Sequence, residues 1–256
     1  MRKFLAGFII LICLSSAVQN VAAQSDEIKP KYLVWEVKVS PAQLGESLKA
    51  INAQHEFLKG QNYPYAGFVQ YSNDGYLWYS TPIRNYADID QINETDKKLW
   101  EENKEKSEEL QKLFEGSYKT VSGMVLVEQP ELCVLSQTTE MPTGKRFRYF
   151  EKFYIKQGKG QEFEEIVKKY KALRVKHGVT DAFYTFYPAF APDLSVVYFI
   201  DEVGMSPAEH FSENDKIWEK FGAEGEQLWN DVIQVVDKIE THIGQVDYDV
   251  SYFPAN

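Results

Sequence analysis

The chain has 256 residues, of which 44% are hydrophobic and 14% aromatic, and its formal net charge is −10. This composition is too apolar and too aromatic for a disordered protein, and the length suits one large or two small domains. An acidic surface repels phosphate backbones and anionic lipids, so nucleic acid and membrane surfaces are not the partners we expect.

The first 23 residues are typical of a secretory signal peptide. Arg2 and Lys3 precede the apolar stretch FLAGFIILICL, and small residues follow at Val21–Ala23. The apolar stretch is shorter than the roughly 20 residues that a membrane span needs. A lipid anchor on Cys13 is disfavoured because Ile12, a large residue, stands before it. We therefore expect export to the periplasm or the medium, with no membrane insertion after cleavage.

Beyond residue 23 the chain contains a single cysteine, Cys133, which cannot form an internal disulfide. It lies in the apolar segment ELCVL without a basic neighbour in sequence, so a buried inert thiol is favoured over a catalytic one. The four histidines lack metal-ligand spacing, and no phosphate-binding loop or nucleophile elbow is present. The sequence therefore predicts no metal and no cofactor.

The first repeat is predicted over residues 31–136 and begins with the alternating segment Tyr32–Val39, which is typical of a half-buried strand. A helical pattern, two strands around the turn Asn73–Gly75, a long helix from near Asp88 and the strand Thr120–Glu128 follow. The polar segment 137–145 is predicted to be a linker.

The second repeat, over residues 146–254, shows the same order of elements. Arg146–Ile155 alternates, a helical pattern follows, and two strands flank a loop expected at Pro188–Asp193. Ser206 and Glu209 fit a capping box at the start of a second long helix, which holds two glycines typical of a kink or a close contact. The strand Lys238–Asp247 ends the repeat.

The two repeats also share a short motif. With Trp100 set on Trp218, Lys98 meets Lys216, Glu101 meets Glu219, and apolar positions coincide over about 35 residues. These tryptophans are interpreted as anchors of the two long helices. The order strand, helix, strand, strand, helix, strand is the ferredoxin-like βαββαβ order.

The duplicated layout resembles the dimeric α/β-barrel superfamily in a fused, tandem form, with antibiotic-biosynthesis-monooxygenase-like, NIPSNAP-like and EthD-like proteins among its members. The resemblance covers about residues 31–254 and rests on topology, since no catalytic motif is shared. It implies an α+β fold in which two ferredoxin-like repeats pack sheet to sheet. Members include heme enzymes, cofactor-free oxygenases, isomerases and proteins of unknown role, so the resemblance selects no activity.

Strand parity predicts which side chains face the space between the sheets. Val37, Val39, Phe153 and Ile155 are expected to face the helices. The opposite parity, which is expected to face inward, carries Val34 and Phe150. It also carries these polar candidates: Glu36, Lys38, Arg148, Lys152, Tyr154, Glu240 and His242.

Charges between the sheets are costly unless they are paired or used. We expect Glu36 and Lys152, which take matching places in the two repeats, to form an ion pair. Glu36, Lys38, Tyr154 and Glu240 are candidate pocket residues. His242 matches Met124 of the first repeat and is either a hydrogen-bonded structural histidine or a proton-handling group.

Two hypotheses of function follow. In the first, the barrel is a non-catalytic or unassigned exported protein that binds a small apolar or aromatic ligand between the sheets. The aromatic strands GYLWYS and AFYTFYPAF would line a pocket in that case, and would otherwise be ordinary core. In the second, a cofactor-independent oxygenase or isomerase uses His242 for proton transfer, with Arg148 or Lys152 stabilising an anion. A heme enzyme is a third alternative, and the oligomeric state is open.

Overall fold

The computed structural model describes residues 29–135 and 143–254. The predicted signal peptide lies outside the described residues, and so does most of the predicted linker at 137–145. None of the helices in the two described ranges combines the length and the apolar character that crossing a bilayer requires.

Each half of the chain supplies four strands and its own helices. The first half consists of β1 (Lys31–Val39), α1 (Leu44–Gly60), β2 (Gly67–Ser72), β3 (Tyr76–Ile83), α2 (Ala87–Glu102), α3 (Lys104–Phe114) and β4 (Tyr118–Glu128). The second half consists of β5 (Lys145–Ile155), α4 (Gly160–Lys176), β6 (Phe183–Phe190), β7 (Val196–Asp201), α5 (Pro207–Val235) and β8 (Val236–Tyr252). Short 3₁₀ turns follow β1 and β4 at Pro41–Gln43 and Pro130–Leu132.

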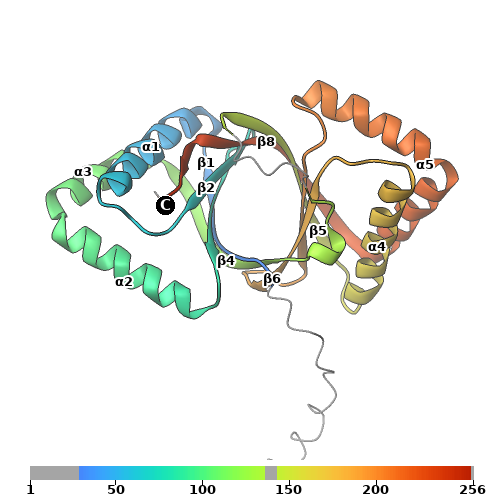
Figure 1. Ribbon diagram of the computed structural model, residues 1–256, viewed down its shortest axis with the longest axis horizontal. Coiled ribbons are helices and arrows are strands. Elements are labelled where there is room, and N and C mark those ends of the chain that lie inside the picture. The colour runs from blue at the N-terminus through green and yellow to red at the C-terminus, as the bar shows by residue number, and fades with distance from the viewer. Residues whose placement is uncertain (1–28, 136–142, 255–256) are drawn as a thin grey trace, which may run out of the picture.

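The eight strands form one closed barrel in the order β1-β3-β2-β8-β5-β7-β6-β4, in which β4 pairs again with β1. The two halves join where β2 pairs with β8 and β4 pairs with β6 (Figure 1). The expectation of two ferredoxin-like sheets packed face to face is therefore corrected to a single barrel. Closure pairs the strand edges that two separate sheets would leave open.

The helices cover the outside of the barrel in two groups. Figure 1 shows α1, α2 and α3 against one side and α4 and α5 against the other. Val39 and Ile155 pack toward these helices, whereas Val34 and Phe150 belong to an apolar cluster inside the barrel. The strand parity predicted from alternation is thus confirmed at these positions.

The long helix of each repeat is interrupted, in a different way in each half. In the first half, a single long helix was the wrong prediction, because Asn103 (φ −122°, ψ 43°) separates α2 from α3. The Asn103 side chain also donates a hydrogen bond to the Leu99 carbonyl at 2.9 Å, which stabilises this break. In the second half, α5 is kinked at Gly222 (φ 53°, ψ −135°), as the glycines of this segment indicate.

The ends of several elements agree with the sequence. Gly75 adopts φ 91° in the turn between β2 and β3, a conformation that glycine tolerates best. The Ser206 hydroxyl accepts a hydrogen bond from the Glu209 amide at the start of α5. The loop between β6 and β7 is shorter than predicted, since Pro188 lies within β6 and pairs with Leu126 of β4.

Cys133 is buried next to β6. Its sulfur accepts a hydrogen bond from the Thr185 amide at 3.2 Å, and burial raises the pKa of the thiol to about 11. A thiol with this pKa carries almost no thiolate at neutral pH, as expected of a structural cysteine.

Candidate functional site

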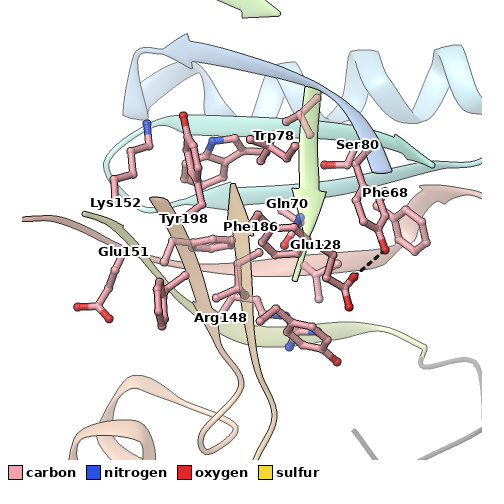
Figure 2. A pocket seen from close by; sticks show the side chains of 18 of the residues that line it. Phe68, Gln70, Trp78, Ser80, Glu128, Arg148, Glu151, Lys152, Phe186 and Tyr198 are labelled. Carbon is pink, nitrogen blue, oxygen red and sulfur yellow. Dashed lines mark hydrogen bonds between the residues drawn. The ribbon is translucent and has the colours of Figure 1, made fainter. Parts of the chain in front are cut away.

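A cavity of about 250 Å³ lies inside the barrel and is the candidate ligand site. Its walls are mainly apolar and aromatic. Trp78 and Phe150 stack with ring centroids 4.6 Å apart, and Val34, Met124 and Leu126 belong to the same buried cluster. Figure 2 shows Trp78, Phe186 and Tyr198 gathered around the cavity, with Lys152 and Glu128 toward opposite ends.

Lys152 and Glu36 form an ion pair across the barrel. Their Nζ and Oε2 atoms are 2.6 Å apart, and the two side chains are 7% and 16% exposed. The strands β5 and β1 that carry them stand opposite each other in the ring of eight strands, so the pair spans the interior. The predicted pairing of these residues is confirmed. Glu36 also accepts a hydrogen bond from the Trp78 indole at 2.7 Å, which fixes this ring against the cavity.

Arg148 lines the cavity and is paired as well. Its Nη2 atom lies 2.7 Å from Glu202 Oε1, and it donates a hydrogen bond to the Tyr248 hydroxyl at 3.2 Å. Burial raises the pKa of Glu202, and the charge of Arg148 opposes that rise. The guanidinium is only 6% exposed, so its charge is balanced inside the protein.

At the end of the cavity opposite Lys152, Glu128 accepts a hydrogen bond from the Tyr32 hydroxyl at 3.2 Å, the dashed line in Figure 2. Burial raises the pKa of Glu128, and the hydrogen bond from Tyr32 opposes that rise. Lys152, Arg148 and Glu128 at the cavity therefore each have a polar partner, and the surface left for a ligand is largely apolar and aromatic.

His242 does not line this cavity. Its Nδ1 atom lies 3.0 Å from Asp74 Oδ2, and its ring centroid is 4.5 Å from that of Tyr76 and 5.7 Å from that of Trp78. The Nε2 atom is buried and has no hydrogen-bond partner among the described residues. Trp78, which borders the cavity, thus packs against His242, and the imidazole forms a separate dyad with Asp74.

The remaining predicted pocket residues lie at the same end of the barrel as His242, outside the cavity lining. Lys38 donates a hydrogen bond to the Asp74 carbonyl at 2.8 Å, and its ammonium lies 3.6 Å above the Tyr76 ring. The Tyr154 hydroxyl donates to Glu240 Oε2 at 2.9 Å. The structure therefore separates the predicted site into two parts. Arg148 and Lys152 line the cavity, whereas His242, Lys38, Tyr154 and Glu240 lie beyond it; Glu36 is not part of the lining either and is joined to it through its ion pair with Lys152.

Several cavity residues were not among the predicted site residues. They are the aromatic Tyr32, Trp78, Phe186 and Tyr198, and the acid Glu128. The sequence held a signal for three of them, because Trp78 and Phe186 fall in the two aromatic-rich strands and Tyr198 in the following strand. Within the described part of the chain, no group of three or more histidine, cysteine or acidic side chains is placed to hold a metal ion.

Comparisons with known proteins support the fold. No protein-family model matches the sequence, and no curated protein matches it. Among solved structures, a candidate monooxygenase from Lactobacillus acidophilus NCFM shares 8% identity at a TM-score of 0.50, covering 89% of this chain and 97% of that one.

Two further structures superimpose somewhat better. A candidate monooxygenase from Fusobacterium nucleatum subsp. nucleatum has a TM-score of 0.55 with 11% identity, covering 86% of this chain and 93% of that one. An anthrone oxidase-like protein has a TM-score of 0.57 with 13% identity, covering 86% and 92%. These neighbours are dimeric α/β-barrel proteins, so the coarser resemblance drawn from the duplicated layout is supported. At this level of identity the likeness concerns the fold.

Proposed function

We propose that the protein binds a small, neutral aromatic or apolar molecule inside the barrel. One observation carries this proposal: a cavity with aromatic walls in which the bordering cations, Arg148 and Lys152, are both neutralised by carboxylates. A concave apolar site with a few fixed polar groups is the usual form of a small-molecule pocket.

The charge of the ligand follows from the ion pairs. An anionic ligand would have to displace Glu36 from Lys152 or Glu202 from Arg148, which leaves a carboxylate unpaired in a buried place. A cationic ligand would meet Arg148 and Lys152 at close range. A neutral ring avoids both costs and gains stacking with Trp78 and Tyr198.

The size of the ligand follows from the volume. A cavity of about 150 Å³ in another protein accepts benzene, so a cavity of about 250 Å³ suits one ring with substituents or two fused rings. The same comparison excludes a heme from the interior of the barrel, because a porphyrin is far larger than two fused rings.

Calorimetric titration with indole tests the proposal. Val34 lines the cavity, and Val34→Phe is expected to fill it and abolish binding, as is the smaller filling change Ser80→Leu. Val121→Phe is the matched control, because Val121 is 46% exposed on the outer face of β4. Circular dichroism checks that each variant is folded. Equal indole binding by the wild type and both filling variants would contradict the proposal.

A second candidate function is a cofactor-independent oxygenase or isomerase, which the His242–Asp74 dyad favours. A carboxylate on Nδ1 fixes the tautomer and leaves Nε2 as a base. The names of the structural neighbours point in the same direction, though their likeness supports only the fold. Oxygen consumption and product formation with ring compounds that bind the barrel test this function. His242→Ala should abolish the turnover found, and Asp74→Asn should reduce it; unchanged turnover in His242→Ala excludes the dyad.

We also propose that the protein is exported and cleaved after Ala23, on the strength of the basic start, the short apolar stretch and the small residues that follow. The intact mass of the protein from its native cells tests this. A mass that includes residues 1–23 would contradict cleavage.

A further inference from the structure

A second, larger cavity lies outside the barrel in the second half of the chain. This outer cavity has a volume of about 810 Å³ and lies between the outer face of β5 and β7 and the helices α4 and α5. It is bordered by Phe153 and Phe199 from the strands, Tyr170 from α4 and Trp218 from α5. The kink at Gly222 also borders it, so the interruption of α5 shapes this space.

The charge of the outer cavity is one-sided. No lysine or arginine is among the described residues that line it. Five acidic residues do line it: Glu151, Asp201, Asp215, Glu219 and Glu226. The barrel cavity differs, because there each bordering cation meets a carboxylate. A concave surface with carboxylates of one sign raises the local concentration of cations.

Aromatic rings form the wall opposite the strands. The centroids of Trp218 and Trp229 lie 6.5 Å apart at an angle of 81°, and Tyr170 lies 6.3 Å from Trp218 at 25°. Trp229 is 44% exposed, so its ring is reachable from solvent. The faces of tryptophan and tyrosine attract organic cations, and perpendicular rings of this kind form the cages that hold quaternary ammonium groups.

Two polar groups at this cavity, the half-buried Glu151 and the buried His210, have unused hydrogen-bonding capacity. No hydrogen bond or ion pair joins the Glu151 carboxyl to another described residue, and Figure 2 shows it pointing away from the barrel cavity. His210, only 1% exposed, has its Nδ1 atom 3.1 Å from the Val203 carbonyl. Nδ1 therefore carries the proton and donates it, which leaves Nε2 as an acceptor without a protein partner. Both groups can accept a hydrogen bond from an ammonium.

The first half of the chain lacks this arrangement. Trp35 takes the place of Glu151: it pairs with Tyr79 and Gly123, as Glu151 pairs with Phe199 and Thr241. The space on that side is about 350 Å³, and Asp96, the acid that lines it, accepts a hydrogen bond from Tyr63 at 2.6 Å. The acidic aromatic cavity therefore arises from differences between the repeats.

We propose that the outer cavity is a second binding site that takes an organic cation, namely an amine or quaternary ammonium compound with apolar or aromatic substituents. Its positive group would lie between Glu151, His210 and the tryptophan rings, and its apolar part against Phe153 and Phe199. Glu151 and Phe199 border both cavities, but the outer cavity lies on the helix side of the strands and differs from the barrel cavity in the charge of its ligand.

Binding at this site is coupled to a proton. Burial, and next the nearby charge of Asp201, raise the pKa of Glu151 to about 8, so the carboxyl is mostly protonated at pH 7. The other charged or titratable groups around this cavity are Tyr149 on β5, Arg174 and Tyr170 on α4, and His210, Asp215, Glu219 and Glu226 on α5. A bound cation favours the carboxylate form and expels the proton. The binding enthalpy at pH 7 should therefore differ between buffers of different ionisation enthalpy.

Three probes with one benzyl framework separate charge from shape: benzylammonium, benzyl alcohol and phenylacetate. We expect calorimetry to show binding of the cation and much weaker binding of the neutral and anionic probes. Glu151→Gln should lower the affinity for the cation by about tenfold, and Trp229→Ala should lower it by about fivefold. Trp35→Ala is the matched control, because Trp35 is also 44% exposed, in the other half, and it should leave the affinity unchanged.

The same titrations carry the outcomes that overturn the proposal. No binding of the cation at millimolar concentration, equal binding of all three probes, or loss of binding in Trp35→Ala but not in Trp229→Ala would each do so. Val34→Phe, which fills the barrel cavity, should leave the cation affinity unchanged. A loss of cation binding in that variant would place the probe in the barrel instead.

Discussion

The two halves of the molecule share one order of elements but differ on the outer face of the sheet. In the first half, Trp35 packs over Gly123 and the third-last residue of α1 is Leu58, which is 3% exposed. In the second half, Glu151 takes the place of Trp35, and the third-last residue of α4 is Arg174, which is fully buried. The same framework therefore supports an apolar layer on one side and a charged cluster on the other.

This difference is consistent with the proposal that the second repeat carries the outer binding site. An apolar layer between helices and sheet needs no ligand, because burial itself stabilises it. A buried carboxyl without a hydrogen-bond partner, such as Glu151, opposes folding. The second half tolerates that cost next to its large cavity, whereas the first half fills the equivalent position with a tryptophan.

The largest effect is expected when the buried Arg174 is replaced by leucine, the residue type that Leu58 provides at the matching place in the first repeat. Arg174 donates hydrogen bonds to the Tyr170 hydroxyl at 2.9 Å and the Asp181 carbonyl at 2.5 Å, and its Nη1 atom lies 3.7 Å from Asp201. Arg174→Leu should lower the free energy of unfolding by about 3–5 kcal/mol, because it leaves Asp201 buried without a counter-charge. Urea denaturation measures the change.

The double variant Arg174→Leu with Asp201→Thr sharpens the same comparison, since Thr81 holds the place of Asp201 in the first half. It should recover part of the lost stability by removing the unpaired carboxyl. If the double variant is less stable than Arg174→Leu alone, the charged cluster is held by contacts other than this pair.

The two helix interruptions should respond differently to alanine. Gly222 adopts a positive φ with an extended ψ, a backbone conformation that is strained for residues with a side chain. A Cβ at this position would meet no atom within 4 Å. Gly222→Ala should therefore cost about 1–3 kcal/mol through the backbone alone. Asn103→Ala should cost less, because Asn103 has a negative φ and the variant loses one partly buried hydrogen bond. Thermal unfolding of both variants ranks them, and the reverse order would contradict this explanation.

The stability of the fold should also depend on pH. The folded protein keeps a proton on Glu151 up to about pH 8, and burial likewise raises the pKa of Asp201 to about 6. The unfolded chain releases these protons near the ordinary pKa values of about 4, so their contribution to stability is complete below that pH. It is lost as the pH rises toward 8, by up to about 1.4 kcal/mol per pH unit for each group.

Glu151→Gln should make the free energy of unfolding, measured by urea denaturation, depend less on pH between pH 6 and 8. Glu128→Gln, which changes a carboxyl at the barrel cavity, is the comparison variant. An identical slope in the wild type and Glu151→Gln would show that Glu151 ionises normally.

Much of the fold was predictable from alternation and duplication. Period-two patterns located the strands, and parity placed Val34 and Phe150 inside and Val39 and Ile155 outside. The ion pair of Glu36 and Lys152 followed from opposite charges at matching places. Barrel closure was not predictable, because the hydrogen bonds of β2 with β8 and of β4 with β6 join segments far apart in sequence, and edge strands carry no signature of their partner.

The site was predicted only in part, for a physical reason. Parity tells which face a side chain occupies but not its height along the barrel, so Arg148 and His242 were grouped although one borders the cavity and the other does not. Glu151 was missed because its parity places it on the helix side of β5, whereas the predicted site was confined to the inward face. The one signal of the outer cavity in the sequence was the pair of glycines in α5, Gly222 and Gly225.

The central claim, that the barrel cavity binds a small neutral ring, is tested most directly by crystals grown with 4-iodobenzyl alcohol. The anomalous signal of iodine locates the ring without assumptions about binding energy. The account predicts a single strong peak inside the barrel, between Trp78 and Tyr198. An iodine peak only in the outer cavity, or none inside the barrel at saturating concentration, would contradict it.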